Sequence, residues 1–194
     1  MNIIEPQYTW ANELAKRTAT TYIVLHHTAG SGMSAEAIHQ SHLANGWAGI
    51  GYHFYVRKDG TVYRGRPIDA AGAHCVNFNS QSVGISAEGN FETEAMNDTQ
   101  KAAIAEVLRH VLSLYPGAVV VRHRDMNQTA CPGANYPFDA IVSMAKNAVI
   151  IIAGGQMFPG KLIDGVTYAP VRKVAEAVGK TVEWNGTTRT VIIK

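Results

Sequence analysis

Two histidines and a cysteine in this sequence have the types and the spacing of a zinc-binding set. His123 and Cys131 lie eight positions apart in the segment HRDMNQTACPG, and His26 directly follows the apolar run Tyr22 to Leu25. The separation of His123 and Cys131 is too long for the two ligands of a zinc knuckle and too short for a separate domain. It suits a strand end followed by a returning loop. Zn2+ held by three protein ligands keeps its fourth tetrahedral position for water, which is typical of hydrolases. The three residues therefore predict a zinc hydrolase.

Short apolar segments rich in β-branched and aromatic residues predict the strands that position these ligands. The predicted strands are residues 22–27, 51–57, 61–64, 83–88 and 119–122. Helices are predicted at 34–45, capped by Ser34, at 99–114, capped by Asp98, and at 138–146. Strands interleaved with helices predict an α/β fold around one sheet.

Composition and charge restrict the class of protein. The chain has 194 residues, of which 46% are hydrophobic and 16% charged, as in ordinary globular proteins. Residues 1–147 carry eleven basic and twelve acidic side chains, and no basic stripe with interleaved aromatics appears, so nucleic-acid binding is not expected. The longest apolar run, residues 148–153, is far too short for a membrane span. The N-terminus lacks the basic and apolar regions of a secretory signal.

The residue composition changes near residue 149, where glycine and proline pairs appear. This change predicts a catalytic domain at 1–147 and a small C-terminal module at 148–194. The second part contains the glycine and proline pairs Gly154-Gly155 and Pro159-Gly160. A helix is predicted from Val171 to Val178, followed by a hairpin whose strands, 181–184 and 189–193, flank an Asn-Gly turn. This module carries six basic and three acidic residues, so it is either drawn to an anionic polymer or simply solvated.

Six segments in unbroken order resemble the type-2 N-acetylmuramoyl-L-alanine amidases, which share a fold with the peptidoglycan recognition proteins. They are residues 23–30, 49–54, 58–66, 72–74, 82–85, and 122–125 together with Cys131-Pro132-Gly133. The resemblance covers about residues 1–146. It implies a central mixed β-sheet flanked by helices. It also implies a Zn2+ enzyme that hydrolyses the amide between the lactyl group of N-acetylmuramic acid and L-alanine in bacterial cell-wall peptidoglycan.

The resemblance also assigns roles at the metal. Strand residues alternate faces, so His26 and His27 cannot both reach one ion, and the resemblance selects His26. Tyr52 matches the family's catalytic tyrosine, which implies a hydrogen bond to the developing oxyanion or to the attacking water. The alternative for Tyr52 is a core aromatic whose hydroxyl is satisfied elsewhere.

Two positions depart from the family pattern. Many relatives have a lysine two positions before the ligand cysteine, where this chain has Thr129, which can donate a hydrogen bond but carries no charge. Some relatives have a glutamate where this chain has Ser86, and Glu88 lies two positions further on the same predicted strand face. Glu88 either serves as a general base for the zinc-bound water, or it points away or pairs with a basic residue.

Three further residues are candidates for binding substrate. His74 matches a family position in the substrate groove, and Asn79 matches a loop asparagine whose alternative role is to cap a turn. Trp47 either lines the groove or packs behind it. Cys75, the other cysteine, is expected to be a buried free thiol and is given no role.

The C-terminal module resembles the copper-amine-oxidase-like N-terminal module of bacterial surface proteins, through residues 165–184. It contains no histidine, so copper is not inferred. Its expected role is wall attachment or homodimer formation. The whole chain is expected to be a phage or prophage endolysin, made in the host cytoplasm without a signal peptide and acting on the wall after release. The alternatives are a non-catalytic recognition protein and a bacterial autolysin or recycling amidase.

Overall fold

The computed structural model describes residues 2–163 and 165–194, so Met1 and Asp164 lie outside the described residues. The chain divides into two compact units, Met1–Ala145 and Lys146–Lys194. The boundary expected from the sequence lies two residues later, after residue 147. Among the described residues, the structure contains no helix with the length and apolar character needed to span a membrane.

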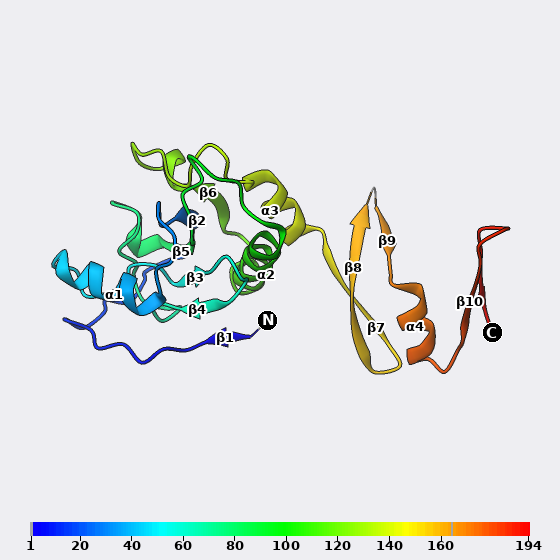
Figure 1. Ribbon diagram of the computed structural model, residues 1–194. Helices are drawn as coiled ribbons and strands as arrows, with labels where there is room; N and C mark the ends of the chain where they lie inside the picture. The colour runs from blue at the N-terminus through cyan, green and yellow to red at the C-terminus, as the bar shows by residue number, and fades with distance from the viewer. Residues whose placement is uncertain (1, 164) are drawn as a thin grey trace. The chain divides into compact units, whose positions relative to one another are not determined.

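The first unit is built on a six-stranded sheet with the strand order β1-β4-β3-β5-β2-β6 (Figure 1). Neighbouring strands pair parallel except β3 and β4, which pair antiparallel, so the sheet is mixed. The fold class predicted from the sequence is confirmed. The strands are β1 (Ile3–Ile4), β2 (Tyr22–His27), β3 (Phe54–Val56), β4 (Val62–Arg64), β5 (Ser82–Ala87) and β6 (Val119–Arg122).

Three helices and two short 3-10 turns complete the first unit. They are α1 (Ala35–Ala44), η1 (Asn79–Gln81), α2 (Asp98–Leu114), η2 (His123–Asp125) and α3 (Phe138–Lys146). Ser34 caps α1 as predicted, because its side chain accepts a hydrogen bond from the Ala37 N–H. The predicted cap of α2 was wrong by one residue. Asn97 has the extended backbone of an N-cap and accepts from the Gln100 N–H, while Asp98 is already helical.

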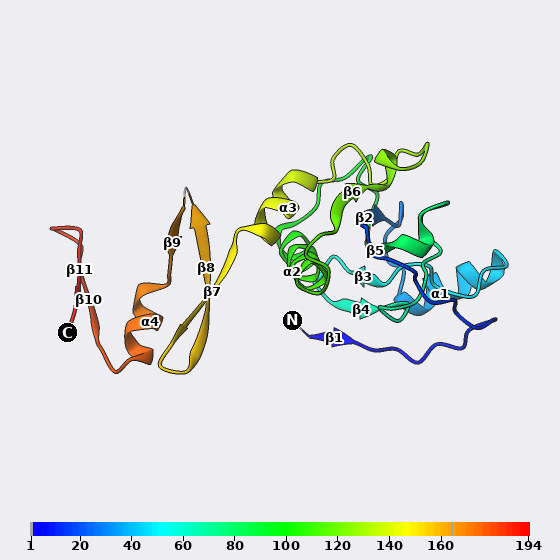
Figure 2. The same cartoon turned by 180° about the vertical axis from the view of Figure 1, so that it is seen from behind.

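The helices pack on both faces of the sheet, and strand alternation decides which side chains meet which helix. Phe54 and Val56 lie in a core cluster with residues of α2 and α3, whereas Tyr55 between them packs with Ala35 and Ile38 of α1. Figure 2 shows the same layers from behind. In β2 the same alternation puts Leu25 in the α2 cluster and turns His26 to the opposite face.

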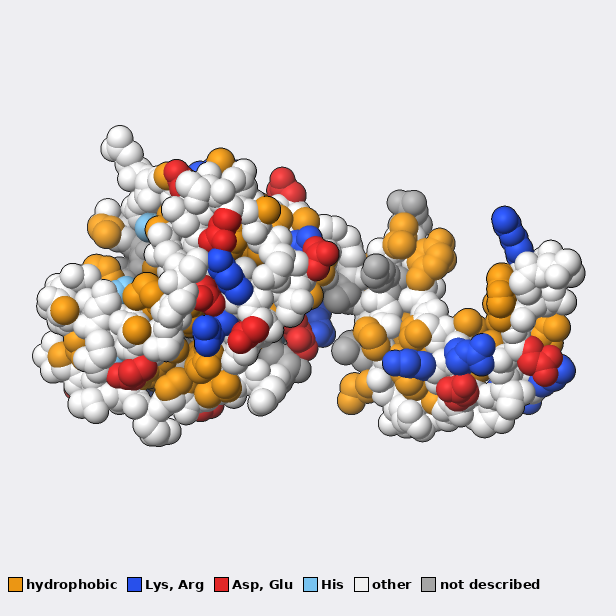
Figure 3. All heavy atoms as spheres, in the orientation of Figure 1, with side chains coloured by type: hydrophobic (Ala, Val, Ile, Leu, Met, Phe, Trp, Pro, Cys, Tyr) orange, Lys and Arg blue, Asp and Glu red, His pale blue; other side chains and the backbone are white. Residues whose placement is uncertain are grey.

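The C-terminal unit contains an antiparallel sheet, a helix and a hairpin. The elements are β7 (Ala148–Ala153), β8 (Gln156–Ile163), β9 (Val166–Tyr168), α4 (Val171–Ala177), β10 (Val182–Asn185) and β11 (Thr190–Ile193). The helix and hairpin were predicted, while the β7-β8-β9 sheet was not. Large hydrophobic side chains such as Ile152, Met157 and Trp184 are exposed here, and Figure 3 shows orange side chains over this unit. Its described residues therefore bury little apolar surface of their own.

A fully buried histidine next to the sheet couples the stability of the fold to pH. His53 accepts a hydrogen bond at Nδ1 from the Gly84 N–H (3.0 Å), and its Nε2 lies 2.9 Å from the Ala70 carbonyl oxygen. The pKa of His53 is lowered to about 3, mainly by burial; the bond to Ala70 opposes this shift, and the charge of Arg17 adds to it. Between that pKa and 6.5, His53 therefore binds a proton in the unfolded chain but not in the folded chain. The free energy of unfolding consequently falls as the pH falls.

We expect His53→Gln to make the pH dependence of unfolding shallower. Below pH 6.5, one refused proton contributes a slope of about 1.4 kcal/mol per pH unit, which the variant loses. The measurement is the free energy of unfolding by urea at pH values from 7 to 5. The matched control is His110→Gln on α2. Comparing the slopes of the unfolding free energy against pH removes any effect common to replacing a histidine with glutamine. Equal slopes in His53→Gln and the control would contradict the assignment.

Candidate active site

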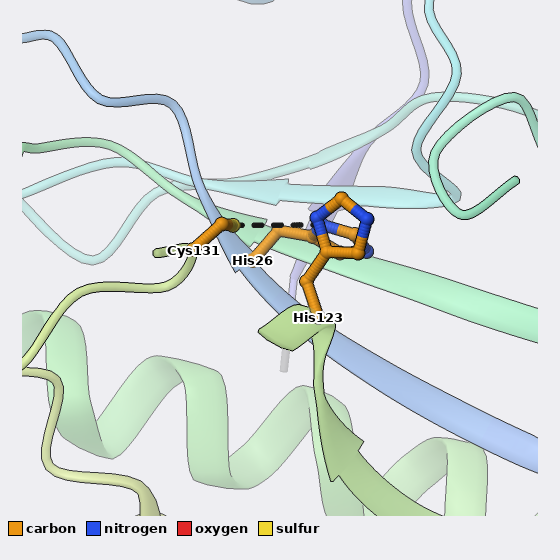
Figure 4. A group of neighbouring side chains, drawn as sticks. All are labelled: His26, His123 and Cys131. Carbon is orange, nitrogen blue, oxygen red and sulfur yellow. Dashed lines mark hydrogen bonds between the residues drawn. The ribbon is translucent and has the colours of Figure 1, made fainter. Parts of the chain in front are cut away.

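The carboxyl ends of β2 and β6 bring two histidines to one edge of the sheet. The two strands are parallel neighbours with Leu25 opposite Arg122, so the next residue of each, His26 and His123, emerges at the same level. Cys131 returns to this edge on the loop after η2, where its carbonyl oxygen accepts from the Arg124 N–H (2.8 Å). One ligand atom from each of His26, His123 and Cys131 lies within 4.8 Å of the others (Figure 4).

In each of the two histidines, one ring nitrogen contacts a residue outside the group, and the other is available to a metal. His26 Nδ1 lies 3.8 Å from the Cys131 sulfur, while its Nε2 lies 3.0 Å from His74 Nδ1. The His123 Nε2 lies 3.1 Å from the Asn127 Oδ1, which leaves its Nδ1 for a ligand. Ligand atoms about 2.0–2.3 Å from a tetrahedral ion stand about 3.6 Å apart, so the nitrogen–sulfur distance fits zinc.

The protonation of the three groups also fits a metal. Burial, and then the neighbouring His74 and His123, hold the pKa of His26 well below its usual value. Burial likewise lowers the pKa of His123, so both rings are neutral at physiological pH. Without a metal, burial raises the pKa of Cys131 to about 11, and the His27 N–H opposes that rise. A metal must displace the thiol proton, so zinc affinity rises with pH.

Tyr52 stands beside this group just before β3. Its ring lies 5.2 Å from the ring of His26, centroid to centroid. Burial, and then the charge of a Cys131 thiolate, raise the pKa of Tyr52 to about 12. The hydroxyl therefore keeps its proton at neutral pH and can act as a hydrogen-bond donor.

Two hollows meet at the metal-binding group, and Tyr52 and His123 border both. One, of about 440 Å³, has a polar wall formed by Asn90, Glu92 and Thr129 and is completed by His26, His27, Ala29, Ala130 and Cys131. The other, of about 380 Å³, is lined by Trp47, Ala73, His74, Val76 and Asn79. A chain-like substrate thus has room on both sides of a bond placed near Tyr52 and His123.

The three predicted substrate residues lie around the second hollow, and each also makes contacts within the protein. His74 is only 8% exposed, and its ring is packed so closely that a side chain at Gly72 or Gly84 would overlap it. The Asn79 Oδ1 accepts from the backbone N–H groups of His74 (2.8 Å) and Cys75, which is the turn-capping alternative. Trp47 is exposed, and its ring lies 4.6 Å from that of His42.

Thr129 lies in the first hollow, which Cys131 also lines. Its Oγ1 accepts a hydrogen bond from the Cys131 N–H (3.2 Å), and the side chain is exposed. The hydroxyl proton remains available to donate to a substrate. Adjacent His27 turns away to the α2 side, where its Nδ1 accepts from the Phe91 N–H (3.2 Å), as strand alternation predicts.

Glu88 does not line either hollow, and the structure supports the second interpretation of this residue. Strand β5 ends at Ala87, so the alternation that would have turned Glu88 toward the metal-binding group no longer applies. Its carboxylate accepts from the N–H groups of Gly32 (2.6 Å) and Lys58 (3.0 Å) and pairs with Arg57 (3.4 Å). Burial raises the pKa of Glu88, but these hydrogen bonds and Arg57 outweigh it and hold the pKa low. We therefore replace the general-base hypothesis with a structural one.

Accordingly, Glu88→Gln should lower stability and leave turnover nearly unchanged. The amide keeps one acceptor but loses the charge that two backbone N–H groups and Arg57 stabilise, at a cost of about 1–3 kcal/mol. Thermal unfolding measures the loss of stability, and the rate at which the folded variant hydrolyses the substrate expected from the sequence measures turnover. A tenfold fall in rate with unchanged stability would restore the general-base role.

Sequence reasoning missed Asn127, whose side chain contacts His123, one of the candidate metal ligands. The available signal was its position four residues after a predicted ligand histidine, which is the reach of one helical turn. The Asn127 side chain also accepts a hydrogen bond from the Cys75 thiol. No signal in the sequence indicated this contact, because the two residues lie 52 positions apart.

Comparison with known proteins adds the family. Residues 16–134 match the N-acetylmuramoyl-L-alanine amidase family model, and residues 143–194 match the copper amine oxidase N-terminal domain. The chain is 39% identical to Peptidoglycan-recognition protein SC2 of Drosophila simulans over 127 residues, covering 59% of this chain and 69% of that protein. It is 37% identical to the endolysin of Enterobacteria phage K11 over 129 residues, covering 62% and 85%.

A solved structure agrees with these matches. The endolysin N-acetylmuramoyl-L-alanine amidase LysCS from Clostridium intestinale superposes with a TM-score of 0.70 at 43% identity, covering 72% of this chain and 92% of that one. The family model spans more than half of the chain, including all three metal-binding candidates and Tyr52. This chain therefore belongs to the N-acetylmuramoyl-L-alanine amidase family, with the fold shared by the peptidoglycan recognition proteins and a C-terminal copper-amine-oxidase-type module.

Proposed function

We propose that this protein is a zinc-dependent amidase that cleaves the bond between the lactyl group of N-acetylmuramic acid and L-alanine in peptidoglycan. The observation that carries the proposal is the convergence of His26, His123 and Cys131 within 4.8 Å, beside Tyr52 and between two hollows. Family membership supports the substrate class.

The donor set would hold Zn2+ through two neutral imidazoles and a thiolate. When bound, zinc supplies Lewis acidity, which polarises an amide carbonyl and acidifies water near neutral pH. The chain itself contributes the geometry. The His26 and His123 rings are held by His74 and Asn127, and the His27 N–H lies 3.4 Å from the Cys131 sulfur, where it stabilises a thiolate.

Tyr52 is proposed to stabilise the transition state. Water adds to the amide carbon, the carbonyl oxygen gains negative charge, and the C–N bond then breaks as the nitrogen takes a proton. The products are the lactyl carboxylic acid and the free amine of L-alanine. A protonated Tyr52 hydroxyl, ensured by its raised pKa, can donate to the developing oxyanion. The Thr129 hydroxyl, in the same hollow, is a second donor of this kind.

The test is chemical analysis of peptidoglycan digested by the purified protein. The proposal expects new N-terminal L-alanine, no new reducing sugar, and loss of both clearing and product after treatment with a chelator. Re-addition of Zn2+ should restore them. Reducing ends in place of free alanine amines would show a glycosidase and contradict the proposal.

The second candidate function is peptidoglycan recognition without catalysis. The similarity to Peptidoglycan-recognition protein SC2 supports peptidoglycan as the polymer that would be bound. In that case the chain would sediment with insoluble peptidoglycan whether or not a chelator is present, and the turbidity of the suspension would not fall. The presence of Cys131 completes a ligand set and favours the enzyme.

The similarity to phage endolysins supports release from a host cell followed by action on the cell wall, in preference to an autolysin or recycling role. The C-terminal module is proposed to bind wall polymer. Homodimer formation through the module stays a prediction, which sedimentation equilibrium of the full chain would test.

A further inference from the structure

The Asn127 side chain contacts three groups, one of them the His123 ring, and these contacts determine which way its amide points. The Oδ1 atom lies 3.1 Å from the His123 Nε2 and 3.2 Å from the Cys75 sulfur, while Nδ2 lies 3.2 Å from the Val76 carbonyl oxygen. A carbonyl oxygen can only accept, so the Asn127 NH2 group must face Val76. The amide oxygen must then face His123 and Cys75.

This orientation fixes the tautomer of His123. An oxygen acceptor opposite Nε2 requires that Nε2 carry the hydrogen, which leaves the lone pair on Nδ1, the atom available to a metal. The Cys75 S–H donates to the same oxygen and holds it in place. Cys75 is 1% exposed, so solvent does not compete for that bond. The two segments on either side of the amide, residues 75–76 and η2, are thereby tied together.

We propose that Asn127 is a positioning residue for the metal: its amide oxygen holds His123 in the Nδ1-ligating tautomer and ring orientation, and Cys75 and Val76 hold the amide. The proposal rests on the metal site proposed above. A partner of this kind, contacting a ligand but not the ion, typically contributes 10-fold to 100-fold in metal affinity or activity.

Two substitutions separate positioning from simple scaffolding. Asn127→Leu preserves much of the volume and removes all three hydrogen bonds. Asn127→Asp keeps an oxygen facing His123, as a stronger acceptor, but turns a second oxygen toward the Val76 carbonyl. We expect Asn127→Leu to lower the affinity for zinc about 10-fold to 100-fold. Asn127→Asp should bind zinc as tightly as the unsubstituted protein or more tightly, and should unfold at a lower temperature.

The measurements are zinc affinity, by competition with a chromophoric chelator, and the visible spectrum of the Co2+-substituted full chain. A displaced ligand ring should alter the Co2+ bands in Asn127→Leu and leave those of Asn127→Asp close to the original. The matched control is Asn135→Leu, which removes a hydrogen bond to the Glu92 carbonyl in the same loop without contact to His123. It should leave zinc affinity and the Co2+ spectrum unchanged.

The outcomes are distinguishable from failure of the metal site itself. If the unsubstituted protein binds zinc and Asn127→Leu binds it equally well, the positioning role is wrong. If both Asn127 variants lose zinc equally, the bond to Val76 matters and the acceptor does not, which also overturns the proposal. Should Asn127→Leu fail to fold, the affinity and Co2+ spectrum of Asn127→Asp still decide the question. An unsubstituted protein that binds no zinc would overturn the proposed metal site along with this inference.

Discussion

Replacing Cys131 with serine is expected to abolish the proposed zinc binding and the proposed peptidoglycan hydrolysis together. Serine is nearly isosteric, but its hydroxyl is far harder to deprotonate than a thiol and is a poor zinc ligand at neutral pH. Partners that only orient zinc ligands already contribute about 10-fold to 100-fold, so loss of a ligand should exceed 100-fold in both affinity and rate. Metal analysis after dialysis and the release of alanine amines measure the two effects.

The matched control for Cys131→Ser is Cys75→Ser, at the other free cysteine. A serine at position 75 still donates a hydrogen bond toward Asn127, so zinc should be retained. If Cys131→Ser lost zinc completely and still cleaved peptidoglycan, hydrolysis would not depend on this site. Equal losses in the two variants would contradict a ligand role that is specific to Cys131.

Replacing Tyr52 with phenylalanine is expected to lower turnover and to leave the proposed zinc in place. The substitution removes one hydroxyl and preserves the aromatic contact with His26. Removing a single oxyanion donor typically lowers kcat by about 100-fold to 1,000-fold. The rate of amine release at saturating substrate, together with bound zinc per chain, tests this prediction.

The control for Tyr52→Phe is Tyr55→Phe, three residues further along the chain. The Tyr55 hydroxyl donates to the Met33 carbonyl oxygen (2.7 Å) on the α1 side of the sheet, so its loss should cost about 1 kcal/mol of stability with little change in turnover. A Tyr52→Phe protein with the original rate would reduce Tyr52 to a packing residue.

Much of the first unit was predictable because its strands are short, apolar and bounded by turn residues. The segments 22–27 and 119–122 were predicted with the bounds that β2 and β6 have. Once these strands are parallel neighbours with Leu25 opposite Arg122, the next residue of each must meet the other, which is why His26 and His123 lie together. Alternation alone could not choose between His26 and His27, and the family resemblance made that choice.

The contacts that sequence reasoning missed depend on long-range packing. Glu88 was expected on the strand, but β5 ends one residue earlier and the turn at Arg57 and Lys58 supplies its partners. The Asn127 contact required the loop at Cys75 to lie beside η2. In the C-terminal unit, Pro159 is a residue typical of strand ends or edges, yet it lies within β8.

X-ray absorption at the zinc K-edge of the purified, zinc-loaded chain tests the central claim most directly. The claim is that His26, His123 and Cys131 hold one ion. It predicts one zinc per chain, with one sulfur at about 2.3 Å and nitrogen or oxygen ligands at about 2.0–2.1 Å in a four-coordinate shell. Any zinc that Cys131→Ser still binds at high zinc concentration should show no sulfur contribution. A shell without sulfur, or one whose sulfur persists in that variant, would contradict the claim.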